Sequence, residues 1–250
     1  MNVNEEQELK KEFQLERIIL FSDAVFAIIL TIMVIELKLP EGFRSVSKEV
    51  FLHEMKNVSL QLFGYALSFF FVAMFWTRHV RLFSFVKDYD KGLLVHNLLF
   101  LFCISLFPFA VSMLGGFAKP SSIQGQWGFN IYVITIFLCL FMFSFLAGYL
   151  MRNSEKLCYT PAEMEREIKW KVLKAHNWIA PLMLAVLFGM NIAGVPPQYF
   201  VYTMAVYGVV TSRVSKYYYP KTLADNRPFI LRMFAGRQKK SRRAKLPAGE

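Results

Sequence analysis

Residues 17–36 read RIILFSDAVFAIILTIMVIE. The stretch is apolar apart from a few polar residues, and the apolar character continues to Leu39, just before Pro40. A helix needs about 20 mostly apolar residues to cross the hydrocarbon core of a bilayer. We therefore predict a transmembrane helix from near Ile18 to Leu39, and with it a membrane protein.

Working outward from this helix, we find five more apolar stretches of sufficient length. The six predicted spans cover residues 18–39, 59–76, 92–114, 129–150, 178–193 and 199–214. A short GVPPQ connection makes the last two an antiparallel hairpin. The predicted fold class is an all-α integral membrane protein with six transmembrane helices per subunit. Its parts are a cytoplasmic N-terminal segment (1–16), a transmembrane unit (17–216) and a basic cytoplasmic tail (217–250).

The composition supports a membrane protein and argues against nucleic-acid binding. Hydrophobic residues make up 55% of the chain and charged residues only 19%, and the charges cluster between the apolar stretches. The net charge is +11, yet no nucleic-acid motif accompanies it. For the basic tail two interpretations stay open, contact with anionic lipid and a solvated tail.

The placement of Lys and Arg predicts the orientation. The N-terminus, the segments 77–91 and 151–174 and the C-terminal end carry 24 of the 29 basic residues. Because cytoplasmic segments are enriched in Lys and Arg, both termini of this multi-pass protein are expected on the cytoplasmic side of the cell membrane. In the fourth connection, Thr160-Pro161-Ala162-Glu163 predicts a capping box that opens an amphipathic helix reaching Lys174.

The sequence contains no motif that is typical of an enzyme active site. H-E-x-x-H and G-x-S-x-G motifs are both missing, and the three cysteines, Cys103, Cys139 and Cys158, have no paired spacing. We predict no enzyme activity, no cofactor and no fixed metal ion.

The first span has two faces. Ile28, Ile32 and Ile35 recur at steps of four and three residues and share one face of a helix. Asp23 precedes Ile28 by five residues, about 140° around the helix axis, and points elsewhere. Such an apolar stripe is also typical of a helix that faces lipid or packs in a core, so by itself it does not establish a pore.

A second group of polar residues lies at one predicted depth, where the first span begins, the second ends and the third begins. A charged or polar side chain inside a membrane needs a partner or a water-filled cavity. We interpret the group mainly as a packing network, with a proton relay or substrate site of a secondary transporter, built on Arg17, Asp23, His79 and His96, as the alternative. The full group is Arg17, Ser22, Asp23, Trp76, His79, His96 and Asn97.

The pattern Arg17-x-x-x-Phe21-Ser22-Asp23, followed by AVFAIILTIMVIELKLP, resembles the signature of the transmembrane protein 175 family of potassium channels, in its bacterial form. The resemblance implies a homotetramer in the lipid bilayer, with the first helix of each subunit lining the pore. The chain lacks the TVGYG filter of ordinary potassium channels. The resemblance places the narrowest ring at Ile28, with Thr31, Ile32 and Ile35 nearby.

Such a ring implies a potassium channel with modest preference over sodium, in which potassium ions pass transiently. Isoleucine offers an ion no ligand, so passage favours the ion that loses less on partial dehydration, which is potassium. A narrowed apolar ring also empties of water and closes the pore.

Overall fold

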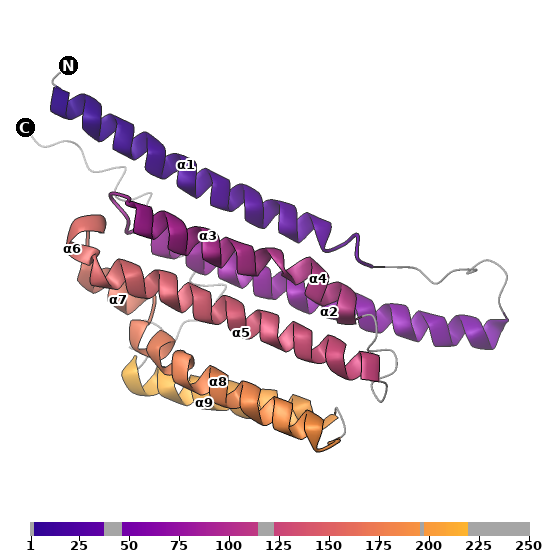
Figure 1. The fold of residues 1–250 in the computed structure, drawn as a ribbon. Helices are drawn as coiled ribbons and strands as arrows, with labels where there is room; N and C mark the ends of the chain where they lie inside the picture. The colour runs from indigo at the N-terminus through magenta and orange to yellow at the C-terminus, as the bar shows by residue number, and fades with distance from the viewer. Residues whose placement is uncertain (1–2, 38–46, 115–122, 196–197, 220–250) are drawn as a thin grey trace, which may run out of the picture.

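The computed structural model describes residues 3–37, 47–114, 123–195 and 198–219, and these are almost entirely helical (Figure 1). The described part of the chain contains no β-strand, so the all-α fold class is confirmed; a single antiparallel bridge joins Val86 to Cys158. The helices are α1 (Val3–Ile32), α2 (Lys48–Phe83), α3 (Lys91–Ser105), α4 (Phe107–Leu114), α5 (Ile123–Arg152), α6 (Ser154–Leu157), α7 (Pro161–Glu167), α8 (Trp170–Ile192) and α9 (Gln198–Tyr218).

Each predicted span lies largely in a long helix, with α3 and α4 together forming the third. Within the described residues, three helical stretches are long and apolar enough to cross a membrane by length and composition: Lys91–Leu114, Trp127–Arg152 and Trp170–Met190. The count of six spans therefore stays a prediction. The first helix also differs from expectation at both ends, because α1 includes most of the N-terminal segment and ends at Ile32.

Aromatic side chains from four helices fill the centre of the bundle. Phe26 of α1 and Phe75 of α2 each lie 6.1 Å from Phe100 of α3, measured between ring centroids. Phe143 of α5 lies 5.5 Å from Phe100 on the same measure. All four rings are fully buried. Tilted rings at these distances pack favourably, and close packing is what holds helices together in lipid.

Two helix interruptions have local causes. Leu106 separates α3 from α4, and Pro108, which cannot donate a backbone hydrogen bond, is the second residue of α4. The predicted helix from Pro161 to Lys174 is wrong at its end, because α7 stops at Glu167 and Lys169 adopts a left-handed backbone with φ 53°. The predicted capping box is also wrong, since the Thr160 side chain makes no capping hydrogen bond. Proline at the first position starts the helix without it.

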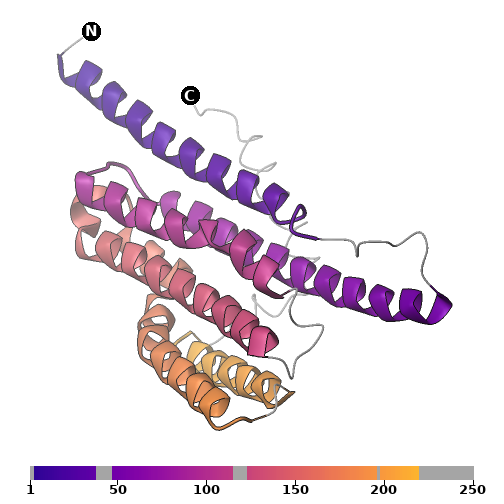
Figure 2. The same ribbon diagram turned by 45° about the vertical axis from the view of Figure 1, so that its right-hand side comes forward.

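The helices stack in the order α1, then α2 with α3 and α4, then α5, then the hairpin of α8 and α9 (Figures 1 and 2). Consequently α1 lies at one margin of the subunit and the hairpin at the other. Helix α1 packs against α2, α3 and α4. Its remaining surface is left uncovered.

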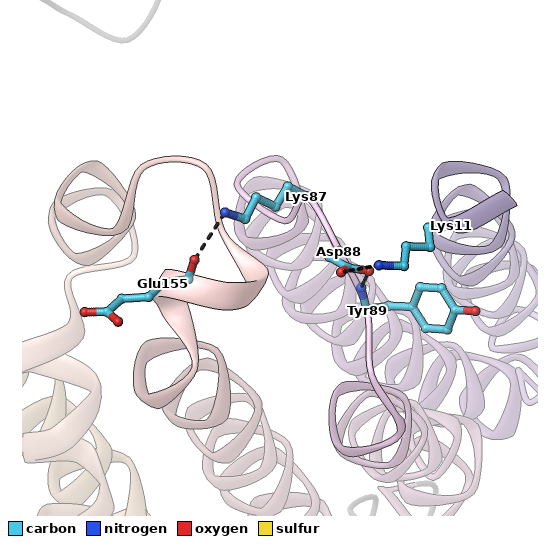
Figure 3. Close-up of polar contacts among 5 residues, drawn as sticks. All are labelled: Lys11, Lys87, Asp88, Tyr89 and Glu155. Carbon is cyan, nitrogen blue, oxygen red and sulfur yellow. Dashed lines mark hydrogen bonds and ion pairs between the residues drawn. The ribbon is translucent and has the colours of Figure 1, made fainter. Parts of the chain in front are cut away.

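At one end of the bundle, segments rich in Lys and Arg lie next to one another and are joined by polar contacts (Figure 3). Lys11 of α1 forms an ion pair of 3.4 Å with Asp88, which lies between α2 and α3. Lys87 Nζ donates to the carbonyl oxygen of Glu155 in α6 at 3.2 Å. Backbone bonds from Lys87 to Leu157 and from Tyr159 to Phe85 reinforce this junction. The predicted basic tail, from residue 220 onward, lies outside the described residues.

Candidate functional site

One face of α1 is buried against the subunit. Ser22, Phe26, Ile29 and Met33 follow one another at steps of four, three and four residues, and each is at most 5% exposed. This spacing keeps them on a single side of a helix that turns every 3.6 residues. Apolar contact along this face fixes which surface α1 presents outward.

The isoleucine stripe lies on the uncovered surface of α1. Ile28, Ile32 and Ile35 are 55%, 41% and 73% exposed in the subunit. The stripe is not entirely helical, since α1 ends at Ile32 and Ile35 sits in a following turn held by its backbone bond to the carbonyl of Ile32. A tight turn of this i→i+3 kind is common where an α-helix ends.

Thr31 lies beside the stripe and is exposed. Its hydroxyl donates to the carbonyl oxygens of Ile28 at 2.8 Å and Ala27 at 3.1 Å. Because the hydroxyl proton is used within the helix, the oxygen presents only its lone pairs to the outside. Lone pairs are what a cation requires from a ligand.

A chain of hydrogen bonds joins α1, α2 and α3 in the interior. Asn97 Nδ2 donates to Ser22 Oγ at 2.9 Å, and Ser22 Oγ donates in turn to the Ile18 carbonyl at 2.8 Å. Asn97 Oδ1 lies 2.8 Å from His79 Nε2. An amide oxygen only accepts, so His79 carries its proton on Nε2. All three side chains are at most 1% exposed.

His79 is held by aromatic rings as well as by Asn97. Its ring stacks on Phe83 at 4.3 Å and on Phe100 at 5.9 Å between centroids, and it meets Phe26 at 5.7 Å. A histidine enclosed in this way has no open side for a substrate. His79 is thus surrounded by Asn97 and the three aromatic rings of its own subunit.

Asp23 is held separately, at the border between α1 and α2. Trp76 Nε1 donates to Asp23 Oδ1 at 2.9 Å. Asp23 is half-buried and Trp76 is exposed on the surface of the subunit. The remaining predicted members lie apart from these contacts. Arg17 and Phe21 are exposed, and no hydrogen bond or ion pair joins Arg17 to another described residue.

His96 belongs to a different group of contacts. Its Nδ1 donates to the Gly92 carbonyl oxygen at 2.7 Å, and its ring stacks on Tyr149 at 4.5 Å. The polar group predicted from the sequence is thus two separate connections, Ser22–Asn97–His79 and Asp23–Trp76, with Arg17 and His96 elsewhere. Among the described residues, no three His, Cys, Asp or Glu side chains are placed to hold a metal ion.

The isoleucine stripe, the hydrogen bonds of Asn97 to Ser22 and His79, and the Asp23–Trp76 bond all lie within one stretch that matches a family model. Residues 17–108 match the model of the family described as endosomal/lysosomal potassium channel TMEM175. Through these residues the chain is similar to the TMEM175 family. The match covers the second half of α1, all of α2 and α3, and the first residues of α4, and so contains every residue of the predicted site. The family resemblance seen in the first span is thereby confirmed.

Two curated relatives illustrate the extent of the likeness. A potassium channel of Chryseobacterium sp. (strain P1-3) is 40% identical over 95 residues, 38% of this chain and 46% of the relative. The endosomal/lysosomal proton channel TMEM175 of Mus musculus is 32% identical over 122 residues, 48% of this chain and 23% of the relative. The chain thus spans about half, or less, of the length of these curated relatives.

A likeness of fold to a solved structure extends over most of the chain. The crystal structure of a lysosomal potassium-selective channel TMEM175 homolog from Chamaesiphon minutus superposes with a TM-score of 0.62. It is 19% identical and covers 82% of this chain and 98% of that chain. At this identity the likeness concerns the fold alone.

The polar contacts of Asp90, which lies within the matched residues 17–108, were not predicted from the sequence. Asp90 caps α3, since its carboxylate accepts from the Leu93 backbone N–H at 2.8 Å, and it also accepts from the Tyr149 hydroxyl of α5 at 2.7 Å. Burial alone raises the pKa of Asp90, but these two hydrogen bonds and the charge of Lys156 outweigh it and lower the pKa. An aspartate directly before a long apolar run was the available signal for this cap.

Proposed function

We propose that the chain is a subunit of an oligomeric cation channel whose pore is lined by α1. The observation that carries the proposal is the exposure of Ile28, Ile32 and Ile35 on a helix whose opposite face is buried. A helix at the margin of the subunit is where neighbouring copies meet. Four copies around a central axis, each contributing α1, would enclose a path that one bundle of six helices has no room for.

The ion proposed is potassium, with modest preference over sodium. A ring of Ile28 side chains supplies no oxygen ligand, so an ion must lose part of its hydration shell to pass. Potassium is the less tightly hydrated of the two ions and loses less. Thr31 supports this arrangement, because its hydroxyl lone pairs lie next to the ring while its proton is bonded to the helix.

The names of the relatives are compatible with cation permeation but differ in the ion. The Chryseobacterium relative is named a potassium channel and the mouse relative a proton channel. A test of this chain must therefore measure potassium, sodium and proton flux together. The proposed orientation, with both termini cytoplasmic in the cell membrane, rests on the 24 of 29 basic residues on one predicted side.

A secondary transporter built on Arg17, Asp23, His79 and His96 gains no support. Asp23 is bonded to Trp76, His79 to Asn97 and His96 to Gly92, so these residues do not converge on one site. Buried side chains that satisfy one another set helix packing without binding a substrate.

The deciding experiment is ion flux into liposomes that contain the purified protein. Replacing the apolar ring by a hydratable one, with Ile28→Asn, should raise total flux several-fold and bring potassium and sodium flux close together. The matched control is Leu182→Asn on α8, since Leu182 is 65% exposed at the other margin of the subunit. This control should leave flux and ion preference as in the wild type. No flux in the wild type, or equal effects of the two variants, would overturn the proposal.

A further inference from the structure

A cavity of about 390 Å³ lies at the basic end of the bundle, remote from the isoleucine stripe. Four parts of the chain surround it: the end of α2, the middle of α5, the junction of α7 and α8, and the last turns of α9. The family match ends at residue 108, so most of this wall lies outside the matched region. The channel function proposed above makes no use of the cavity.

Positive charge predominates in the cavity wall. Arg78, Arg81 and Lys169 line it together with one carboxylate, Glu167. Glu167 lies 3.9 Å from Arg81, and both side chains are more than half exposed, so water screens this pair. The charges of Arg78 and Lys169 are left without a carboxylate partner in the wall.

Arg78 is the more informative of these two cations. Its side chain is partly buried, and no hydrogen bond or ion pair joins it to any residue in the described part of the chain. Tyr207 attracts its charge and Arg81 repels it. A guanidinium removed in part from water, with a like charge nearby, favours binding of an anion that can take up its five N–H donors.

Lys169 reaches the cavity from a strained backbone position. Its φ of 53° lies in the left-handed region, which is unfavourable for a residue with a side chain. Its ammonium group donates to Ser215 Oγ of α9 at 3.3 Å, a neutral partner that leaves the charge unbalanced. The left-handed turn that ends α7 therefore places this unbalanced charge at the cavity.

The other lining groups suit a phosphate joined to an apolar body. Thr211, Ser212 and Ser215 add hydroxyl groups from one side of α9, while Phe143, Val172 and Leu173 add apolar surface. Aromatic rings of the kind found at membrane interfaces lie close by, with Lys174 5.3 Å from the Trp170 ring and Lys171 5.9 Å from the Tyr218 ring.

We infer that this cavity binds a phosphate monoester through Arg78 and Lys169, with the headgroup of an anionic membrane lipid as its source. Arginine holds phosphate oxygens by two parallel N–H donors, and lysine adds a point charge. The hydroxyl groups of α9 complete the contacts, and the apolar wall accepts the part of the lipid next to the phosphate. Soluble phosphate shares the same chemistry and is the other source that a test must separate.

The test measures how much each ligand raises the thermal unfolding temperature of the purified full chain in detergent micelles. The ligands are a short-chain phosphatidate, a short-chain phosphatidylcholine as the zwitterionic control, and inorganic phosphate. We expect a saturable rise with phosphatidate and none with phosphatidylcholine. If inorganic phosphate binds as tightly as phosphatidate, the site stands and its source is soluble. If phosphatidylcholine matches phosphatidate, the proposal fails.

Two variants link the binding to the named residues. Arg78→Gln combined with Lys169→Gln should weaken phosphatidate binding by about tenfold or more, as expected for lost hydrogen bonds to a charged group. Arg213→Gln combined with Lys216→Gln also removes one arginine and one lysine charge, but from positions on α9 that do not line the cavity. This control should leave phosphatidate binding unchanged. Equal loss in both double variants would reduce the effect to general charge attraction and overturn the site.

Lys169→Gly keeps the test independent of folding defects. Glycine adopts a φ of 53° without strain, so this variant should unfold at the wild-type temperature or higher in the absence of ligand. It nevertheless lacks the ammonium group and should bind phosphatidate several-fold more weakly. A variant that is stable and binds as tightly as the wild type would remove Lys169 from the site and contradict the inference.

Discussion

Asn97 Nδ2 of α3 donates a 2.9 Å hydrogen bond to Ser22 Oγ of α1, in the fully buried centre of the subunit. This bond fixes the rotation of α1 about its own axis. Ile28 follows Ser22 by six residues, about 240° further on once a full turn is removed, so the two side chains are about 120° apart around the helix axis. A buried Ser22 therefore carries Ile28 away from α3 and onto the uncovered surface.

Removing the amide of Asn97 should destabilise the protein. Asn97→Ala leaves Ser22 and His79 without this partner, and polar bonds between membrane helices are each worth about 0.6 kcal/mol on average, with a maximum near 1.7. We expect the free energy of unfolding in micelles to fall by about 1–3 kcal/mol. Ser105→Ala, which removes an exposed hydroxyl at the end of α3, is the control and should have little effect. Equal values for the two variants would mean that the connection does not hold α1.

Two glycines should respond in opposite directions to the same substitution. A methyl group added at Gly128 of α5 would overlap the carbonyl oxygen of Met113, which is backbone and cannot move aside. Gly128→Ala should therefore lower the free energy of unfolding by about 1–3 kcal/mol. Gly189 of α8 has open space around it, and Gly189→Ala should raise stability by up to about 1 kcal/mol through better helix propensity. Denaturant titration of both variants checks the pair, and a stable Gly128→Ala protein would show that α4 and α5 are further apart than described.

Stability should depend on pH through Asp90. The pKa of its carboxyl is lowered in the folded protein, so the stabilisation is present above the unfolded value near 3.9 and is lost as pH falls through the folded value. Asp90→Ala removes the cap of α3 and should cost about 1 kcal/mol at neutral pH. Thermal unfolding followed from neutral pH down to below about pH 3 should show a smaller pH dependence in Asp90→Ala than in the wild type.

Tyr149→Phe provides the companion variant for this pH dependence. It removes the hydroxyl that donates to Asp90 at 2.7 Å and leaves the cap bond to Leu93 in place. The folded pKa of Asp90 should then lie closer to its unfolded value, so the loss of stability in acid should be smaller than in the wild type. An unchanged acid profile would indicate that Tyr149 does not influence the carboxylate.

The ion pair between Lys11 and Asp88 should contribute little to stability. The two side chains are 60% and 23% exposed, and exposed pairs are usually worth less than about 1 kcal/mol. A double-mutant cycle with Lys11→Gln and Asp88→Asn should give a coupling energy in that range, smaller at high salt. The backbone bonds between residues 85–87 and 157–159 hold the same junction without charge. A coupling energy well above 1 kcal/mol would assign the pair a larger role.

Much of the fold was predictable because the bilayer restricts the choice of structure. Backbone groups must bond internally in lipid, so long apolar stretches become helices. The exceptions have local causes that periodicity does not reveal. Pro108 interrupts the third predicted span, and Lys169 ends a helix that was expected to continue to Lys174. The family signature at Arg17, Phe21, Ser22 and Asp23 was readable from the order of residues alone.

The sequence by itself determined the helical class, the approximate positions of the long helices and the two faces of the first helix, since all three follow from residue spacing and the cost of polar groups in lipid. Only the tertiary structure decided which polar residues meet. It joined Ser22 to Asn97 and Asp23 to Trp76, it placed His96 against Tyr149, and it brought Arg78 to the same cavity as Lys169. Contacts between helices far apart in the chain depend on how whole helices rotate and pack, and no local pattern records that rotation.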